Sequence, residues 1–371
     1  MRVPGSSVLA VGMLPPPVGG QAVMFEVAIA SLRTEYQVDV IDLQVQRNIG
    51  SSGKFNAFKI VAFLRILLRS LKVLLGPKIY DVLYYCPSGP SVLGSVKDAI
   101  LLILLRRCAR KTVFHFHATG GSSYLKLKLP LIANLVLMPT LRPDLSIRCA
   151  EVYPNDAEIC DSRKSVIIYN GVRDIREEAQ DMIGAGKGPL PILLFMGAMT
   201  YDKGIFDLLQ IAAELKARSR KFHVKVAGQG TADELNSFCE LRRELNVVDE
   251  VEYIGVVSGR EKAELLASAM VFVFPTFFRA ETQPLVLIES LAVGVPVVAS
   301  NWRGIRSIVD EGGCGFTPDV HAIEIFCDRI EEIVWSKDYI KFCLAARQRY
   351  EQLFRLETFA SGVGKAIREI I

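Results

Sequence analysis

The sequence predicts two doubly wound, Rossmann-like α/β domains. Short runs of apolar, β-branched residues alternate with longer helical patterns, which is typical of βαβ units and a mostly parallel sheet. The alternation occurs twice, on either side of a stretch at residues 184–191 that contains Gly and Pro. With 371 residues, half of them hydrophobic, the chain is long enough for two domains with sizeable cores.

The first half contains six expected strands. Helical patterns fill the gaps between them, notably at Lys54–Leu75 and Ser91–Arg110. The expected strands are Val8–Leu14, Val38–Leu43, Asp81–Cys86, Thr112–His117, Leu145–Cys149 and Val166–Tyr169.

Five more strands and three closing helical patterns make up the second half. We expect a first domain at residues 1–183, a second domain at residues 184–355, and a final helix at 356–371 that crosses back to the first domain. Since parallel sheets bind ligands at the carboxyl ends of their strands, two sets of strand ends are expected to face a central cleft. The strands are Ile192–Met196, Val224–Ala227, Val251–Ile254, Val271–Phe274 and Pro296–Ala299.

The composition excludes several classes of protein. Charged residues make up 23% and no long repeat recurs, which excludes disordered, collagen-like and solenoid chains. The eight cysteines show neither C-x-x-C spacing nor a Cys/His cluster at zinc spacing, so no disulfide framework and no metal site are expected. We therefore expect a cytoplasmic protein.

Neither a signal peptide nor a membrane span is expected. The N-terminus, MRVPGSSVLAVGMLPPPVGG, has one Arg and an apolar run interrupted by prolines, which predicts a first strand. The longest wholly apolar run is Ala99–Leu105, far short of the ~20 residues that cross a bilayer.

Charge is distributed unevenly, although the net charge is only +4. The first half is net basic, and between residues 43 and 143 the only acids are Asp81 and Asp98. Such an excess of positive charge attracts anionic partners. Nucleic acid is not expected among them, because no aromatic stacking platform or binding motif accompanies the charge.

Two basic, apolar segments fit an anionic membrane surface. Arg65, Arg69 and Lys72 form a cationic stripe on a strongly apolar helix, and residues 124–139 add a second patch. The ordinary alternative is a helix packed on the sheet with its charges in water, so a peripheral membrane location stays open beside a purely cytoplasmic one.

Glycine-rich turns are weak signals in this chain. The turn at Gly228 and Gly230 has Asp233 in the third glycine position, which does not support a dinucleotide fingerprint, and no P-loop occurs. Gly19 and Gly20 follow the first strand, where backbone without Cβ atoms can approach a ligand closely or simply form a tight turn.

The most informative segment is residues 274–300. Pro284 suits a helix start and Gly294 its end, so Glu281 lies in the loop before a mostly apolar helix and Glu289 within it. An ionised carboxylate there is costly unless a partner hydrogen-bonds to it. The hydroxyls of a bound sugar or ribose would serve, and so would a neighbouring Arg or solvent.

The two glutamates with seven residues between them, the apolar helix and the GVPVVA strand resemble the signature of glycosyltransferase family 4. Its members are retaining, nucleotide-sugar dependent and have the GT-B fold. Other stretches are similar in the expected order: the glycine pair at Gly19 and Gly20, FHFH at 114–117, YNGV at 169–172, LLFMGAMTYDKG at 193–204 and EYIGVVSGREKAELLASAMVFVFPT at 252–276.

The resemblance implies roles for residues around the donor diphosphate. Lys203 would pair with the diphosphate, near Gly197. The family often has an Arg directly after this glycine, whereas this chain has Ala198, and Arg279 is a candidate for compensation. The nucleotide base would lie near Gly255 and Val256.

The same resemblance assigns the sugar-facing residues. Glu289 would hold the ribose, while Glu281 and the backbone from Thr282 through Pro284 to Leu285 would address the transferred sugar and β-phosphate. His117, near the end of its strand, would touch the donor sugar or acceptor. A packed core histidine is the alternative for His117, and more so for His115.

The expected function is transfer of a sugar from a nucleotide diphosphate donor, with retention, to a glycan or lipid diphosphate-linked acceptor in bacterial surface polysaccharide biosynthesis. No two-carboxylate cluster has metal-binding spacing, so no cofactor or metal is expected. Three alternatives stay open: a sugar-nucleotide epimerase, an NAD-dependent oxidoreductase, and a non-catalytic nucleotide-sugar-binding homologue.

Overall fold

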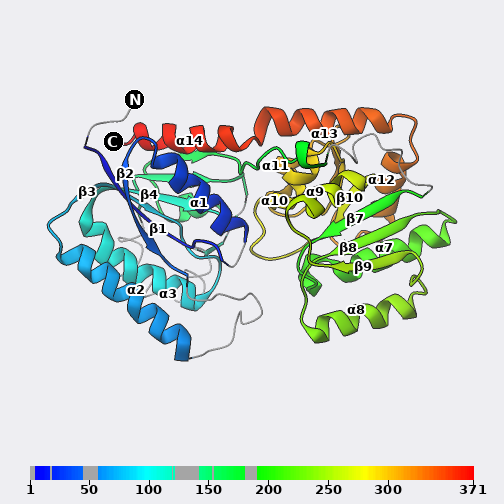
Figure 1. Ribbon diagram of the computed structural model, residues 1–371, viewed down its shortest axis with the longest axis horizontal. Coiled ribbons are helices and arrows are strands. Elements are labelled where there is room, and N and C mark those ends of the chain that lie inside the picture. Colours follow the sequence, from blue (N-terminus) through cyan, green and yellow to red (C-terminus); the bar gives the residue numbers. More distant parts are fainter. Residues whose placement is uncertain are drawn as a thin grey trace. The chain divides into compact units, whose positions relative to one another are not determined.

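The structure is a computed structural model that describes residues 5–16, 19–44, 57–118, 120–121, 142–152, 154–179 and 190–371. It divides into two compact units, and each unit contains one six-stranded parallel sheet (Figure 1). The first unit is Met1–Asn170 together with Glu357–Ile371, and the second is Gly171–Leu356. Two doubly wound domains are thus confirmed.

The boundary between the units lies earlier than the predicted position after residue 183. Val172 forms a parallel bridge with Arg355, and its amide donates to the Phe354 carbonyl over 3.0 Å. Because these hydrogen bonds hold residue 172 to the end of the second unit, that unit begins at Gly171.

The first sheet has the strand order β2-β1-β3-β4-β5-β6. All six expected strands form, with ends shifted by a few residues. The fourth strand ends one residue before His117. The bounds are β1 Ser7–Gly12, β2 Gln37–Asp42, β3 Tyr80–Tyr85, β4 Ala109–Phe116, β5 Leu145–Arg148 and β6 Ser165–Ile167.

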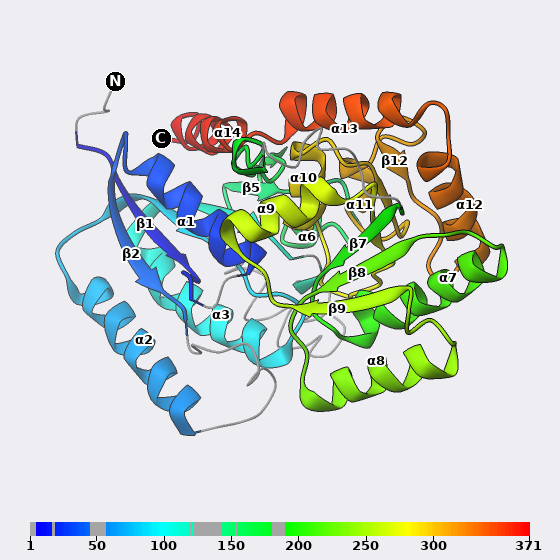
Figure 2. The ribbon, with the colours of Figure 1, turned by 45° about the vertical axis from the view of Figure 1, so that its right-hand side comes forward.

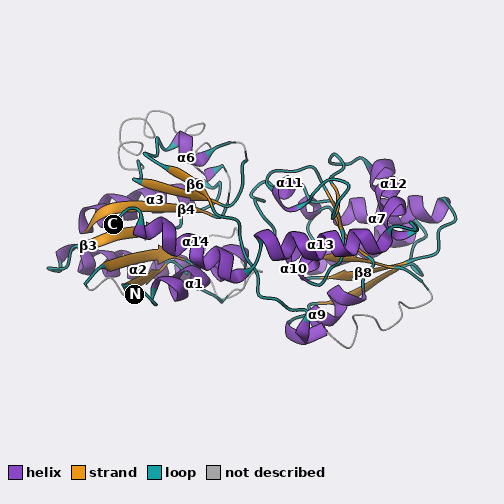
Figure 3. Ribbon diagram, turned by 90° about the horizontal axis from the view of Figure 1, so that it is seen from above, coloured by secondary structure: helices purple, strands orange, loops and turns teal. Residues whose placement is uncertain are grey.

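Helices cover both faces of this sheet (Figure 3). Alternate side chains of β3 and β4 point to opposite faces, as strand geometry requires. Leu83 and Phe114 join a core with α2 and α3, whereas Tyr84 and His115 face Phe25 of α1 and Phe359 of α14. The helices are α1 Gly20–Leu32, α2 Ala57–Leu75, α3 Val92–Leu105, the short α6 Asp156–Ile159 and α14 Leu356–Arg368, with a 3-10 turn at Arg106–Cys108.

One helix boundary differs from the expectation. The pattern at Ser91–Arg110 predicts a helix to residue 110, but α3 ends at Leu105 and Ala109 already begins β4. At its other end, Ser91 caps α3 by accepting from the Gly94 amide over 2.9 Å.

The last helix, α14, is held by the first unit. Ser31 Oγ donates to the Ala360 carbonyl over 3.0 Å, and Lys164 pairs with Glu369 at 2.5 Å. Arg368 also pairs with Glu35. Residues 357–371 therefore complete the domain that the first 170 residues begin.

The second sheet has the order β12-β11-β10-β7-β8-β9. The five expected strands form, and a short sixth strand that the sequence pattern did not reveal, β12, pairs with β11. The bounds are β7 Ile192–Met196, β8 His223–Ala227, β9 Val251–Gly255, β10 Val271–Phe274, β11 Val297–Ala299 and β12 Gly315–Phe316.

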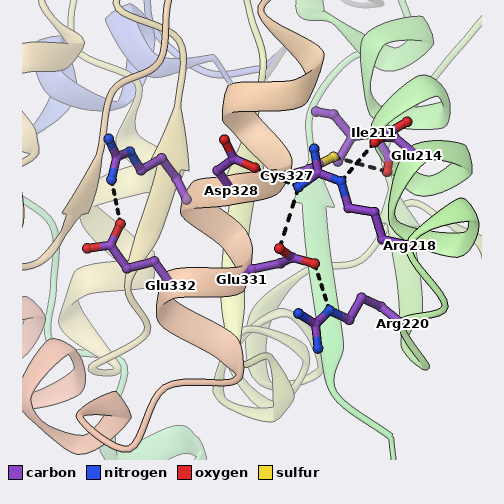
Figure 4. A network of polar contacts seen from close by, with 9 residues as sticks. Ile211, Glu214, Arg218, Arg220, Cys327, Asp328, Glu331 and Glu332 are labelled. Carbon is purple, nitrogen blue, oxygen red and sulfur yellow. Dashed lines mark hydrogen bonds and ion pairs between the residues drawn. The ribbon is translucent and has the colours of Figure 1, made fainter.

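An ion-pair network fixes α7 to α12 in this unit (Figure 4). Arg218 at the end of α7 donates to Glu214 over 2.8 Å and to Asp328 over 2.6 Å, while Arg220 donates to Glu331 over 2.6 Å. These bonds raise the pKa of Arg218. The helices are α7 Ile205–Ala217, α8 Ala232–Glu244, α9 Gly259–Ser268, α10 Leu285–Ala292, α11 Ile305–Ile308, α12 Ile323–Val334 and α13 Tyr339–Leu353, with 3-10 turns at Glu177–Ala179 and Tyr201–Lys203.

Among the described residues, no helix has both the length and the apolar character needed to cross a bilayer.

Candidate functional site

The loop after β10 is fastened to the turn after β7. These two strands are neighbours in a parallel sheet, so their carboxyl ends meet at one edge. The Phe277 amide donates to the Asp202 carbonyl over 2.8 Å, and Thr276 Oγ1 donates to the same carbonyl over 3.3 Å. Trp302 Nε1 holds the loop from its other side through the Phe278 carbonyl at 2.8 Å.

This fastening brings Lys203 and Glu281 together. Lys203 Nζ lies 2.5 Å from Glu281 Oε2, and the two side chains are only 18% and 9% exposed. Thr276 Oγ1 donates to the same carboxylate oxygen over 3.4 Å, and the ring of Phe278 lies 4.5 Å from Nζ. Two sequence-predicted residues, 78 positions apart, thus form a largely buried ion pair at the strand ends.

Gly204 permits the sharp turn between Lys203 and α7. Its φ is +79°, and a Cβ atom there would lie 2.0 Å from the Pro275 carbonyl oxygen. Only glycine tolerates this combination of backbone conformation and close approach. The turn that carries Lys203 can therefore lie against the start of the loop that carries Glu281.

Glu289 is paired with protein in a way the sequence did not reveal. Lys262 Nζ of α9 lies 2.6 Å from Glu289 Oε1 in α10. A neighbouring cation thus donates to this carboxylate, and it is a lysine rather than an arginine. Pro284 caps α10 and Leu285 is its first residue, so both glutamates have the expected positions, one before the helix and one inside it.

Three glycines meet at the ends of β7, β8 and β9. The Gly228 amide donates to the Gly255 carbonyl over 2.8 Å, and a Cβ on Gly228 would lie 1.7 Å from the Gly197 carbonyl oxygen. Gly197 and Gly255 are thus close together at the carboxyl ends of neighbouring strands. Gly228, interpreted from sequence as a structural turn, is the residue between them.

The remaining predicted residues of this unit differ in exposure. Arg279 and Ala198 are exposed, and Val256 is 68% exposed. All three follow the carboxyl ends of strands of the second sheet and have side chains at the protein surface. Thr282 is buried.

Gly19, Gly20 and His117 lie in the other unit. Gly19 caps α1 and Gly20 begins it, and both are exposed at the carboxyl end of β1, with ordinary negative φ at Gly19. His117 follows β4; it is partly exposed, but its Nε2 atom is buried and has no hydrogen-bond partner among the described residues.

His117 belongs to a compact cluster with His115 and Cys149. Their potential ligand atoms lie within 4.8 Å of one another, the kind of group that could hold a metal ion. Cys149 Sγ already donates to the Phe116 carbonyl over 3.2 Å, and burial raises its pKa to about 12, so the thiol keeps its proton. Tyr84 bonds to His115 Nδ1. The expectation that the chain needs no metal stays a prediction.

The two histidines make the stability of the first unit depend on pH. Burial lowers the pKa of His117 to about 3 and that of His115 well below its usual value. In the unfolded chain both take up protons below about pH 6.5, so stability present above that pH is lost as pH falls. We expect each imidazole to contribute up to about 1.4 kcal/mol per pH unit.

Urea unfolding at pH 7 and pH 5 measures this dependence. His117→Gln should make the unfolding free energy less sensitive to pH, and His223→Gln, which replaces an exposed imidazole, is the matched control. An equal slope in all three proteins would contradict the prediction.

Sequence reasoning missed several residues of the site in the second unit. Lys262 and Thr276 lie in the stretch 252–276 that resembles the family, but the sequence assigned them no role, because only the fold brings them to Glu289 and Glu281. Ser300, at the end of β11, is buried, and its hydroxyl has no hydrogen-bond partner among the described residues.

Part of the chain matches a known family of proteins. Residues 177–349 match the family described as glycosyl transferases group 1. The putative colanic acid biosynthesis glycosyltransferase WcaL of Salmonella typhimurium is 25% identical over 262 residues, which cover 69% of this chain and 62% of WcaL. The chain spans about half the length of the curated relatives it matches, between 44% and 62% for three of them.

Solved structures share the complete fold. Sucrose-phosphate synthase from Thermosynechococcus elongatus has a TM-score of 0.75 at 17% identity, covering 98% of this chain and 99% of that one. Anabaena HepE in complex with UDP-glucose has a TM-score of 0.67 at 16% identity, covering 98% and 99%. These neighbours are similar in fold, and the family match covers the unit that holds Lys203 and Glu281. Residues 177–349 are therefore similar to the glycosyl transferases group 1 family, and the chain has the GT-B fold.

Proposed function

We propose that this chain is a retaining glycosyltransferase that moves a hexosyl group from a nucleotide diphosphate sugar to a glycan or lipid diphosphate-linked acceptor. The observation that carries the proposal is the Lys203–Glu281 pair at the strand ends of the unit that matches the family. The UDP-glucose named with HepE supports testing UDP-sugars first.

Lys203 is the residue proposed to take up the charge of the leaving diphosphate. Its ammonium is held by Glu281 and lies against the ring of Phe278, so it is positioned before any donor arrives. A fixed positive charge in a partly water-excluded place stabilises negative charge that grows in the transition state. We propose that this charge replaces a metal ion, and chelator should then leave the rate unchanged.

Glu281 is proposed to face the transferred sugar, and Glu289 the ribose. Each carboxylate already accepts from a lysine, so a sugar hydroxyl would add a hydrogen bond to an ionised group. The backbone of Gly255 is proposed to face the nucleotide base, since a Cβ there would meet no atom within 4 Å, and the neighbouring Gly197 is proposed to lie near the diphosphate. Arg279 and Val256 offer exposed side chains at the same edge.

The acceptor side is proposed to lie in the first unit, where His117 follows β4 and Gly19 and Gly20 stand at the start of α1. The acceptor is proposed to be a growing bacterial surface glycan, met in the cytoplasm. The similarity to WcaL, whose description names colanic acid biosynthesis, supports this class of acceptor.

Product analysis tests the activity. The protein is incubated with a panel of nucleotide sugars and with lipid-linked glycans, and the products are separated. Release of free nucleoside diphosphate together with a new glycosidic bond of retained configuration is the expected result. Donor isomerisation without a new bond, or binding without turnover, would overturn the proposal.

Lys203→Ala is expected to weaken nucleotide-sugar affinity by about 1 to 3 kcal/mol, the size of a charge-assisted hydrogen bond. Titration calorimetry with the donor measures the change. Lys221→Ala, at an exposed position of the same unit, is the matched control. Unchanged affinity in Lys203→Ala would remove this residue from the site.

A further inference from the structure

The outer faces of α2 and α3 are unusually apolar for helices that face water. On α2, Ile60, Leu64 and Leu68 recur every four residues and are 45%, 49% and 60% exposed. Four-residue spacing places side chains on one helix face. This row therefore runs along the solvent side, opposite the buried Ile66 and Ser70.

The neighbouring helix carries a second row. In α3, Val96, Ile100 and Ile103 are 39%, 37% and 38% exposed, and Leu93 at its start is 71% exposed. The two helices lie side by side in both Figure 1 and Figure 2. Together they form an exposed apolar surface, here called the α2–α3 surface, on the first unit. Its large apolar side chains are Ile60, Val61, Leu64, Leu68, Leu75, Val92, Leu93, Val96, Ile100 and Ile103.

The charged side chains that α2 and α3 expose have one sign. Arg65, Arg69 and Lys72 are exposed between the apolar residues of α2, and Arg107 is exposed just after α3. No acidic residue occurs in α2.

The one acidic residue of α3 is directed inward. Asp98 is buried and accepts from the Tyr85 hydroxyl over 2.7 Å and from the Ser88 amide over 2.6 Å. The Asp98 carboxylate is therefore hydrogen-bonded inside the fold and adds no negative charge to the surface of α3. The α2–α3 surface combines exposed apolar side chains with cations and presents no carboxylate from either helix.

We propose that the α2–α3 surface docks on an anionic phospholipid membrane. Apolar side chains would enter the headgroup boundary while Arg65, Arg69 and Lys72 meet lipid phosphates, the combination that holds amphipathic helices at interfaces. A second copy of the chain fits less well, because pairing like faces would bring the cations of both copies together. The docking surface belongs to the first unit and uses neither Lys203 nor Glu281, so the inference does not rest on the proposed activity.

Residues 124–139, the other segment with this composition, lie outside the described residues. The inference therefore stands on α2 and α3 alone.

Flotation with vesicles tests the docking. Vesicles of phosphatidylcholine containing 30% phosphatidylglycerol are compared with pure phosphatidylcholine at about 0.1 M salt. We expect binding to the anionic vesicles, weakened about tenfold or more by the triple change Arg65→Gln, Arg69→Gln and Lys72→Gln. The triple change Leu64→Gln, Leu68→Gln and Leu93→Gln should weaken binding comparably, although it leaves every charge in place.

Matched controls come from the second unit. Ile340 and Leu344 of α13 are 64% and 66% exposed, and replacing both with Gln should not change vesicle binding. A charge control changes Lys221, Arg243 and Lys341 to Gln, all exposed. All variants alter exposed side chains, so circular dichroism and thermal unfolding should match the unmodified protein.

Three outcomes would overturn the inference. The first is vesicle binding that is indifferent to both α2–α3 variants, and the second is an equal loss in the control variants. The third is concentration-dependent dimerisation in sedimentation velocity that the apolar variant abolishes, without any vesicle binding. If the α2–α3 variants no longer bind vesicles but still transfer sugar to a water-soluble acceptor, the result would support docking and would not contradict the proposed activity.

Discussion

Replacing Glu281 with Gln is expected to lower sugar transfer by about a hundredfold to a thousandfold, the range observed when one preorganised electrostatic contact is removed from an active site. The carboxylate is 9% exposed and lies 2.5 Å from Lys203. An amide in its place keeps the shape but no longer balances the lysine or offers ionised oxygen to a sugar. Initial rates at saturating donor and acceptor measure the loss.

Two comparisons make this result interpretable. Glu261→Gln, at an exposed position at the start of α9, should transfer sugar at the unmodified rate. Thermal unfolding of Glu281→Gln separates lost chemistry from lost structure. A folded variant that retains transfer within about threefold of the unmodified rate would exclude Glu281 from the reaction.

Gly204→Ala is expected to destabilise the second unit by about 3 kcal/mol or more. The left-handed conformation at φ +79° alone costs a residue with a side chain about 1 to 2 kcal/mol. The new Cβ would also lie 2.0 Å from the Pro275 carbonyl oxygen, which backbone on both sides cannot accommodate without moving. Urea unfolding followed by circular dichroism measures the change.

Gly255→Ala is a closely matched control. This glycine has the same φ of +79°, but a Cβ there would meet no atom within 4 Å. We expect only the conformational cost of about 1 to 2 kcal/mol. If Gly204→Ala and Gly255→Ala have the same free energy of unfolding, the close approach of residue 204 to Pro275 does not add to the cost of the substitution.

The strands could be predicted because each is an apolar run with a clear beginning and end. Ile192–Met196 and Val271–Phe274 have the predicted bounds, and only β12, two residues long, has no recognisable pattern. The helix before β4 was predicted too long because Arg106–Cys108 continues as a 3-10 turn, which apolar periodicity does not distinguish from a helix.

The site was predictable only in part. Glu281 and Lys203 belong to recognisable motifs, and strand order brings those motifs together. Lys262 was not predictable, since its contact with Glu289 depends on how α9 packs against α10. The boundary near residue 171 was missed for a similar reason, because the bridge between Val172 and Arg355 joins distant positions.

Because α14 packs on the first unit, that unit cannot finish folding until residues 357–371 have been synthesised. Residues 171–356 contain everything the second unit needs, while the first unit lacks α14 until residues 357–371 have left the ribosome. The domain translated first is therefore the one whose native packing is completed last. Until then Phe359 cannot cover His115. Until then the first unit exposes an apolar face that is buried in the native state.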